Sequence, residues 1–275
     1  MLHQNMDSDT QIWTETSDVR KIGGTTNQIS PELEVAMKGN GATTVSATMF
    51  FASMVGISVF VTGGIGGVHR HGEYTMDISS DLTELGRTSI AVISAGIKSI
   101  LDIPRTLEYL ETQGVCVVAY DTNEFPAFFT ETCGCKAPCR VDTPEDCARI
   151  IDATLKLKLG TGILIAVPIP KEHSASGSEI EYAIQCALKE AREKNIIGNA
   201  ETPFLLAKVN ELTGGASLAA SILVFYGVVV LDSAVLHFYV SIFMNNALVG
   251  AKIAAAHAKL RERSKDVSLD LKTGR

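Results

Sequence analysis

The chain has 275 residues, of which 46% are hydrophobic and 20% charged, and its formal net charge is −7. This size and composition are typical of one globular domain in the α/β range. The acidic balance and the lack of a basic stripe argue against a nucleic-acid partner. A bound phosphate would therefore need local donors or a metal ion.

The first part of the chain is polar and poorly patterned, so we expect an irregular N-terminal segment over residues 1–38. Alanines and apolar residues at helical spacing then predict a helix over 40–55, with Asn40 or Thr43 as its cap. The apolar run 57–61 leads directly into glycines and predicts a buried strand.

Apolar runs and helix-start signals alternate after this strand. Further buried strands are predicted over 89–94, 115–120 and 162–167. Helices are predicted over 104–113, 143–159 and 179–194, and from 202 to the glycines at 214–215. This alternation predicts a three-layer α/β/α domain with a largely parallel, mixed sheet. We expect one domain over 39–262 and a polar tail over 263–275.

Residues 221–244 form an apolar run that is long enough to span a bilayer. Asp232 lies at its centre, where a charged side chain costs roughly 2.5–3.5 kcal/mol in a membrane. The β-branched and aromatic content would equally suit an ordinary buried element. A third interpretation, which we favour over a membrane span, is a foreign or misjoined insertion.

Two predicted strands end in glycine-rich stretches that carry cationic side chains. Residues 62–70 read TGGIGGVHR, and residues 95–99 read AGIKS. Ligands of open α/β sheets bind at the carboxyl ends of strands, so His69, Arg70 and Lys98 are candidates for an anionic-substrate site. The glycines fit neither the dinucleotide fingerprint nor a P-loop. From spacing alone, a lysine after a strand is more often a solvated surface residue.

Acids and hydroxyls cluster in residues 76–82, which read MDISSDL. One interpretation is a helix start, with Ser80 or Asp81 as the cap. The other is a metal carboxylate accompanied by hydroxyl donors to a phosphate, since Mn²⁺ prefers oxygen ligands.

The cysteines indicate a reduced compartment rather than a disulfide framework. We expect an intracellular protein, cytoplasmic or peroxisomal. Cys133, Cys135 and Cys139 lie close together, but their spacing is not that of a zinc site. We expect loop thiols there.

Five long motifs occur in a fixed order. They are VFVTGGIGGVHR (59–70), MDISSDL (76–82), AVISAGIKSILDIPRTLEYLET (91–112), NEFPAFFT (123–130) and TPFLLAKVNELTGG (202–215). Together they resemble the pseudouridine-5'-phosphate glycosidase family, most closely its plant forms. The resemblance runs from about Gly39 to Leu260, with one interruption at 221–244. It implies the fold of the indigoidine synthase A-like proteins.

The resemblance also implies an activity. Members of the family reversibly cleave the C–C glycosidic bond of pseudouridine 5'-phosphate to uracil and ribose 5-phosphate. They use a divalent metal, usually Mn²⁺, and no organic cofactor, and they look trimeric. The match implies that Lys98 is the nucleophile that forms a Schiff base with the sugar. Its amine must be neutral near pH 7, and we expect burial and the positive field of a following helix N-terminus to lower its pKa.

The resemblance assigns roles to further residues. Asp77 would be the metal ligand, and Asp81 would both contact substrate and shuttle protons. The amides of an Asn-Asn pair would read the donors and acceptors of uracil. Implied substrate contacts are Val45, Thr62, His69, Ser79, Ser80, Asp81, Asn245 and Asn246.

One departure from the family pattern bears on activity. Family members carry an upstream stretch similar to ESTIISHG, whose glutamate is the general acid/base, and no such stretch occurs here. Residues 28–37 resemble the family's opening and then pass directly into the glycine region. Loss of a general acid/base typically costs about 10²–10⁴-fold in rate. The alternative function is therefore an impaired isoform or paralogue that binds sugar phosphates or partner subunits.

Overall fold

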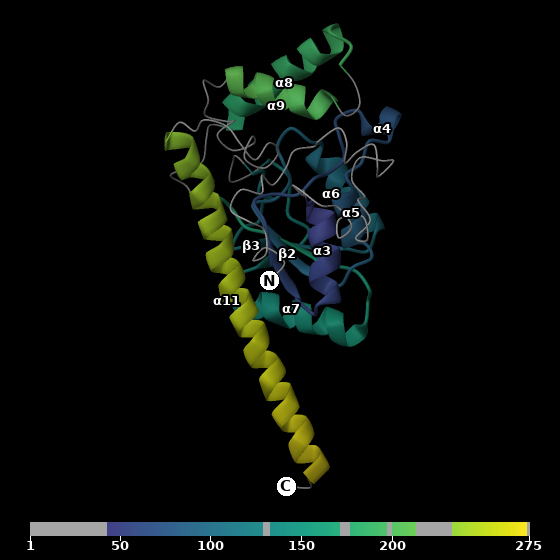
Figure 1. Ribbon diagram of the computed structural model, residues 1–275, viewed down its shortest axis with the longest axis vertical. Coiled ribbons are helices and arrows are strands. Elements are labelled where there is room, and N and C mark those ends of the chain that lie inside the picture. Colours follow the sequence, from purple (N-terminus) through teal and green to yellow (C-terminus); the bar gives the residue numbers. More distant parts are fainter. Residues whose placement is uncertain (1–42, 129–132, 171–176, 197–199, 213–232, 274–275) are drawn as a thin grey trace, which may run out of the picture.

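The computed structural model describes residues 43–128, 133–170, 177–196, 200–212 and 233–273 (Figure 1). The predictions for residues 1–38, for 221–232 and for the glycines at 214–215 lie outside the described residues. The limits of the expected domain, 39–262, therefore stay a prediction.

The core of the protein is a five-stranded sheet in the order β1-β2-β5-β3-β4, in which every pair of neighbours is parallel. The strands are β1 (Val59–Val61), β2 (Ala91–Ser94), β3 (Cys116–Tyr120), β4 (Arg140–Val141) and β5 (Ile163–Ala166). Four of them confirm predicted strands. The fifth, β4, was not predicted because two residues carry no periodic pattern.

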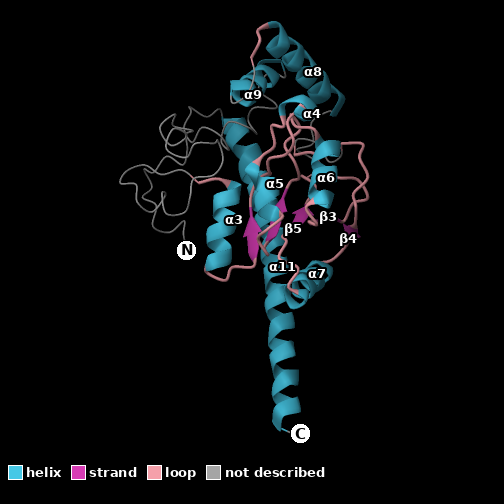
Figure 2. Cartoon of the chain, turned by 90° about the vertical axis from the view of Figure 1, so that its right-hand side faces the viewer, coloured by secondary structure: helices cyan, strands magenta, loops and turns pink. Residues whose placement is uncertain are grey.

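Helices cover both faces of the sheet, which confirms the three-layer architecture (Figures 1 and 2). The helices are α3 (Val45–Met54), α4 (Gly72–Thr75), α5 (Ser80–Leu85), α6 (Ile103–Thr112), α7 (Pro144–Leu157), α8 (Gly177–Glu193), α9 (Glu201–Leu212) and α11 (Ser233–Thr273). One core cluster joins the sheet to α3, α5 and α6, and the other joins it to α7 and α11. Helices α8 and α9 pack against each other at one end of the molecule (Figure 1).

The alternation of side chains along β2 explains why its sequence is uniformly apolar. Val92 belongs to the cluster under α3 and α5, whereas Ala91 and Ile93 belong to the cluster under α7 and α11. A strand buried on both faces needs apolar residues at odd and even positions alike.

The helix starts show which residues satisfy the exposed backbone N–H groups. Thr143 caps α7 as its Thr-Pro start indicates, and its Oγ1 accepts from Asp146 N at 3.1 Å. Two other predicted caps are wrong by one or more positions. Thr44, not Asn40 or Thr43, caps α3. Ser79, not Ser80 or Asp81, caps α5, which leaves the Asp81 carboxylate available for other partners.

The predicted apolar insertion is described only in part, because residues 233–244 form the first turns of α11. Helix α11 packs along α7 and β1, and its C-terminal turns extend beyond the body of the domain (Figure 1). A Cβ at Gly250 would lie 2.4 Å from Val61 Cγ2, so this glycine sets how closely α11 approaches β1. Within the described ranges, no helix has the length and apolar character that crossing a membrane requires.

Candidate active site

The loops that follow β1 and β2 lie side by side at the carboxyl edge of the sheet, as predicted. Ala95 N donates to Gly63 O at 2.8 Å, and Ile65 N donates to Gly96 O at 3.1 Å. Lys98 N donates to Ile65 O at 3.4 Å. The glycine loop (residues 62–70) and the lysine turn (residues 95–99) therefore form one unit, because each supplies hydrogen-bond partners to the other.

Asp81 lies beneath this unit at the start of α5, and its side chain is almost fully buried. Its Oδ2 accepts from Gly66 N at 2.9 Å, and its Oδ1 accepts from Ser46 N at 3.0 Å. A Cβ at position 66 would lie 2.2 Å from Ser79 Oγ and 3.0 Å from Asp81 Oδ2. The close approach of loop and carboxylate therefore requires glycine at this position.

Lys98 and Asp81 lie close enough for the charge of each to act on the pKa of the other. Burial lowers the pKa of the Lys98 amine to about 8, although the negative charge of Asp81 opposes this change. Burial also raises the pKa of the Asp81 carboxyl, against its two backbone hydrogen bonds and the positive charge of Lys98. The pair thus brings an amine and a carboxyl with converging pKa values into one corner of the site.

Burial is one of the two causes expected to lower the pKa of Lys98, and it is confirmed. The expected field of a helix N-terminus stays a prediction. Burial lowers the pKa of Lys98, but the charge that acts on this amine belongs to Asp81 and is negative. The helix that follows begins at Ile103 and is capped by the Asp102 carboxylate, which accepts from Arg105 N at 3.0 Å. Of the two causes identified for this amine, burial lowers its pKa and the charge of Asp81 raises it.

His69 and Asp77 are joined across the loop that precedes α5. The main chains of the two residues bond at 3.0 Å, from His69 N to Asp77 O. His69 Nδ1 lies 3.6 Å from Asp77 Oδ2, and the exposed fractions of the two side chains are 19% and 38%. Burial lowers the pKa of His69, while Asp77 raises it and Lys98 lowers it. His69 is therefore close enough to both Asp77 and Lys98 for their charges to act on its pKa.

The surroundings of Asp77 are not those of a closed structural metal site. A single carboxylate of this kind would suit a loosely held divalent ion better. Among the described residues, no three His, Cys, Asp or Glu side chains come together to hold a metal. Asp77 is a carboxylate that reaches solvent, and an ion such as Mn²⁺ or Mg²⁺ completes its shell with water and phosphate oxygens. Asp77 would supply such an ion with one carboxylate, the kind of ligand that it prefers.

Hydroxyl groups gather where α3 and α5 begin. Ser79 Oγ accepts from Asp81 N at 3.3 Å, and Ser80 Oγ lies 3.0 Å from Ser46 Oγ. Val45 is the first residue of α3 and is partly buried beside them. Sequence reasoning missed Ser46, because its contribution to Asp81 comes from a backbone N–H that every residue type carries.

The two predicted amides anchor α11 to the body of the domain. Asn246 is fully buried, and its Nδ2 donates to Thr62 O at 2.9 Å and to Gly63 O at 3.3 Å. Its Oδ1 has no hydrogen-bond partner among the described residues. Asn245 Nδ2 donates to Pro168 O at 3.1 Å, at the end of β5. Asn246 therefore keeps one unmet acceptor beside the glycine loop.

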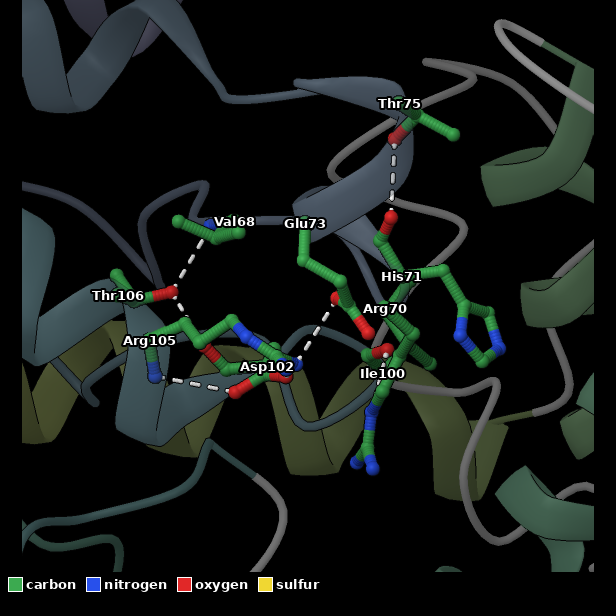
Figure 3. A network of polar contacts seen from close by, with 9 residues as sticks. All are labelled: Val68, Arg70, His71, Glu73, Thr75, Ile100, Asp102, Arg105 and Thr106. Atoms are coloured by element: carbon green, nitrogen blue, oxygen red, sulfur yellow. Dashed lines mark hydrogen bonds and ion pairs between the residues drawn. The ribbon is translucent and has the colours of Figure 1, made fainter.

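Arg70 supports the lysine turn. Its Nη2 donates to Ser99 O at 3.3 Å. Its Nε donates to Ile100 O at 3.4 Å (Figure 3). Arg105 of α6 pairs with Glu73 at 3.1 Å and so ties α4 to α6 (Figure 3). The cation predicted at position 70 thus binds carbonyl groups that adjoin Lys98.

A further acid that sequence reasoning missed comes from α9. The pKa of Glu201 is raised by burial and by the charge of Asp77, and His71 lowers it. Helix α9 therefore places a partly buried carboxyl near the loop that carries Asp77. The Thr-Pro signal predicts where α9 begins, but nothing in the sequence indicates that its first turn faces this loop.

Comparison with known proteins identifies the family. Residues 10–256 match the family model described as indigoidine synthase A like protein. A pseudouridine-5'-phosphate glycosidase of Arabidopsis thaliana is 67% identical over 226 residues, which cover 82% of this chain and 63% of the relative. One of Staphylococcus aureus is 48% identical over 252 residues, which cover 92% of this chain and 75% of that protein. The match thus spans less than two thirds of the plant protein's length.

Solved structures agree with this result. A prealnumycin C-glycosynthase in complex with ribulose 5-phosphate aligns with a TM-score of 0.74 and 31% identity, covering 91% of this chain and 78% of that one. An indigoidine synthase A-like protein of Thermotoga maritima aligns with a TM-score of 0.66 and 32% identity, covering 86% and 73%. The parallel sheet, the paired loops at its carboxyl edge and these matches together show that the chain belongs to the indigoidine synthase A-like family.

Proposed function

We propose that the protein is a pseudouridine-5'-phosphate glycosidase that acts through a Schiff base on Lys98. The observation that carries the proposal is an amine with a pKa of about 8, placed beside a buried carboxyl at the carboxyl edge of the sheet. The relatives named above supply the substrate, and the structure solved with ribulose 5-phosphate supports a sugar phosphate as the ligand class.

The proposed reaction begins with the neutral amine. Its lone pair forms a bond from Nζ to C1' of the ribose, the C1'–O4' bond breaks, and O4' takes a proton. The nitrogen loses a proton, and its lone pair then forms a C1'=N double bond while the C1'–C5 bond to uracil breaks. C5 of uracil takes a proton as this bond breaks, and uracil leaves. Water then hydrolyses the iminium to ribose 5-phosphate and free Lys98.

Asp81 is the proposed proton carrier for these steps. Burial raises the pKa of its carboxyl, which favours the protonated form, and it lies close enough to Lys98 for each charge to shift the other's pKa. Its two backbone hydrogen bonds hold the carboxyl in place while it exchanges that proton.

Substrate recognition is assigned to the groups around this pair. Asp77 would hold the divalent ion, preferably Mn²⁺, whose positive charge would balance the phosphate. Ser79, Ser80 and His69 would contact the sugar phosphate. The unmet Oδ1 of Asn246 would accept from an N–H of uracil.

Trapping with borohydride tests the covalent step. Incubation with ribose 5-phosphate and cyanoborohydride should add a reduced sugar phosphate to Lys98, detected by peptide mass spectrometry. Lys98→Ala should abolish the adduct, whereas Lys136→Ala, which changes a lysine in a different loop, should leave it intact. A folded sample that gives no adduct on Lys98 would end the Schiff-base proposal.

The alternative is a protein that binds sugar phosphates without cleaving the C–C bond. It is favoured by one observation, the absence of the ESTIISHG-like glutamate stretch from the sequence. Release of uracil that depends on Lys98 would exclude it. Tight binding of ribose 5-phosphate without any uracil release would support it.

We further propose a homotrimer, dependence on a divalent metal, and a cytoplasmic or peroxisomal location. Light scattering of the purified protein would measure the mass of the assembly. Chelation should lower uracil release, and Mn²⁺ should restore it. Cell fractionation would test the location.

A further inference from the structure

A second cleft lies at the opposite edge of the sheet from Lys98. Its volume is about 560 Å³, and its walls come from the turn before β1, the loop before β2, α7 and α11. Ser58 directly precedes β1, and Ser89 lies two residues before β2. The cleft therefore adjoins the amino ends of the strands, whereas the candidate active site lies at their carboxyl ends.

His257 of α11 lines this cleft and is an unsatisfied polar group. It is only 3% exposed, and its Nδ1 lies 3.4 Å from Ser58 Oγ. Its Nε2 has no hydrogen-bond partner among the described residues. A buried polar atom without a partner costs about 1–3 kcal/mol, so a group that hydrogen-bonds with this Nε2 would be stabilised there.

The charged side chains of the cleft leave an excess of donors. Arg261 lies one helical turn after His257. The pKa of that histidine is lowered first by burial and then by the positive charge of Arg261, while Asp152 raises it. In the part of the chain that the structure describes, Arg261 has no ion-pair partner. The carboxylate in the cleft, Asp152, is already paired with Lys156 at 2.7 Å. Serine hydroxyls, including those of Ser58 and Ser89, complete the lining.

We propose that this cleft is a second binding site for a small phosphorylated anion. The guanidinium of Arg261 would bind the phosphate, and His257 would donate from Nε2–H while Nδ1 accepts from the Ser58 hydroxyl. A donor-rich cleft matches a group that offers only acceptors, and planar guanidinium groups bind phosphate through paired hydrogen bonds. The volume accommodates a ligand of sugar-phosphate size.

Nuclear magnetic resonance of the full labelled chain separates this site from the active site. Inorganic phosphate and ribose 5-phosphate are titrated in turn, and the ring signals of His257 and the amides of Ser58 and Ser89 are followed. Saturable shifts of these signals are expected. A response to both probes would indicate recognition of the phosphate itself, and a response to ribose 5-phosphate alone would indicate an organic phosphate ester.

Arg261→Gln tests the assignment, with Lys259→Gln as a matched control on the same helix and outside the cleft. Both replaced side chains are exposed, so both variants should keep the native circular dichroism. Arg261→Gln should weaken the His257 response by about tenfold or more, and Lys259→Gln should not. The proposal is overturned if the shifts are confined to the neighbourhood of Gly66 and Lys98, if neither probe binds, or if the two variants bind alike.

Discussion

Lys98 and Asp81 share a water-poor corner of the site, and this arrangement makes the chemistry of the lysine depend on pH. With a pKa of about 8, the fraction of neutral amine rises about tenfold per pH unit below 8 and levels off above it. The rate of adduct formation with ribose 5-phosphate should follow this curve. A rate that still rises tenfold per unit at pH 9 would show an ordinary, solvated lysine.

The lowered pKa of Lys98 also makes the free energy of unfolding depend on pH. An unfolded lysine keeps its proton up to about pH 10.4, whereas the folded amine loses it above about 8. Lys98 therefore opposes folding most below pH 8, and its contribution becomes more favourable as the pH rises from 8 toward 10.

The close contact at Gly66 gives a prediction about packing. Gly66→Ala would drive a methyl group into Ser79 Oγ and the Asp81 carboxylate. We expect a loss of roughly 1–3 kcal/mol in the free energy of unfolding and a fall in trapping at Lys98. Gly86→Ala is the control, since the atoms near that position belong to the flexible side chain of Gln113. Equal effects in denaturant melts would contradict the argument.

Sequence reasoning finds side chains that carry chemistry, but it does not find backbone groups. Lys98, Asp77 and His69 were predicted as site residues because their types and motifs indicate a role, and the structure places them near one another. Ser46 and Glu201 were missed. Ser46 acts through its main-chain N–H, and Glu201 reaches the site only because α9 folds back toward the loop of Asp77.

Among the helices, the N-cap of α7 is expected to contribute measurably to stability. Thr143→Ala removes the Oγ1 that accepts from Asp146 N at 3.1 Å. It should lower the free energy of unfolding by about 1 kcal/mol. Thr112→Ala, at the C-terminal end of α6, should change it by less than about 0.5 kcal/mol. Equal thermal shifts for the two variants would contradict the role of the cap.

Helix α11 offers a case in which helix propensity and packing disagree. Glycine to alanine in a helix usually gains about 1 kcal/mol. At Gly250, however, the new methyl group would lie 2.4 Å from Val61 Cγ2 and push α11 away from β1. We expect Gly250→Ala to destabilise the protein by about 1–3 kcal/mol in urea melts. Ala251→Gly, on the exposed side of α11, isolates the propensity effect. A stabilised Gly250→Ala variant would refute the close contact.

The strands and the longer helices were predicted because each carries a periodic or uniformly apolar pattern with clear ends. The short strand β4 lacks any pattern, and it forms because the loop before α7 runs beside β3. The caps of α3 and α5 were misplaced, because several neighbouring residues have side chains that suit a cap and only the backbone geometry selects one of them. Order within the sheet also escaped prediction, since contacts between distant segments determine it.

For the whole molecule, the hydrogen bonds of Asn246 link the glycine loop after β1 to the last helix, α11. Asn246→Ala leaves the carbonyl groups of Thr62 and Gly63 without this donor, so it should cost about 1–3 kcal/mol in the free energy of unfolding. Asn245→Ala, which loses one bond to a partly buried carbonyl, should cost less. The reverse order in chemical denaturation would show that the link is unimportant.

This link also affects how the chain folds during its synthesis. The glycine loop leaves the ribosome long before its partner on α11, because 184 residues separate Thr62 from Asn246. Until α11 emerges and docks, the nascent sheet exposes the apolar face that this helix covers. Contacts between segments so far apart in the sequence also form slowly. Newly synthesised chains should therefore reach the native fold only after α11 has emerged, and a chaperone that shields that face should raise the yield.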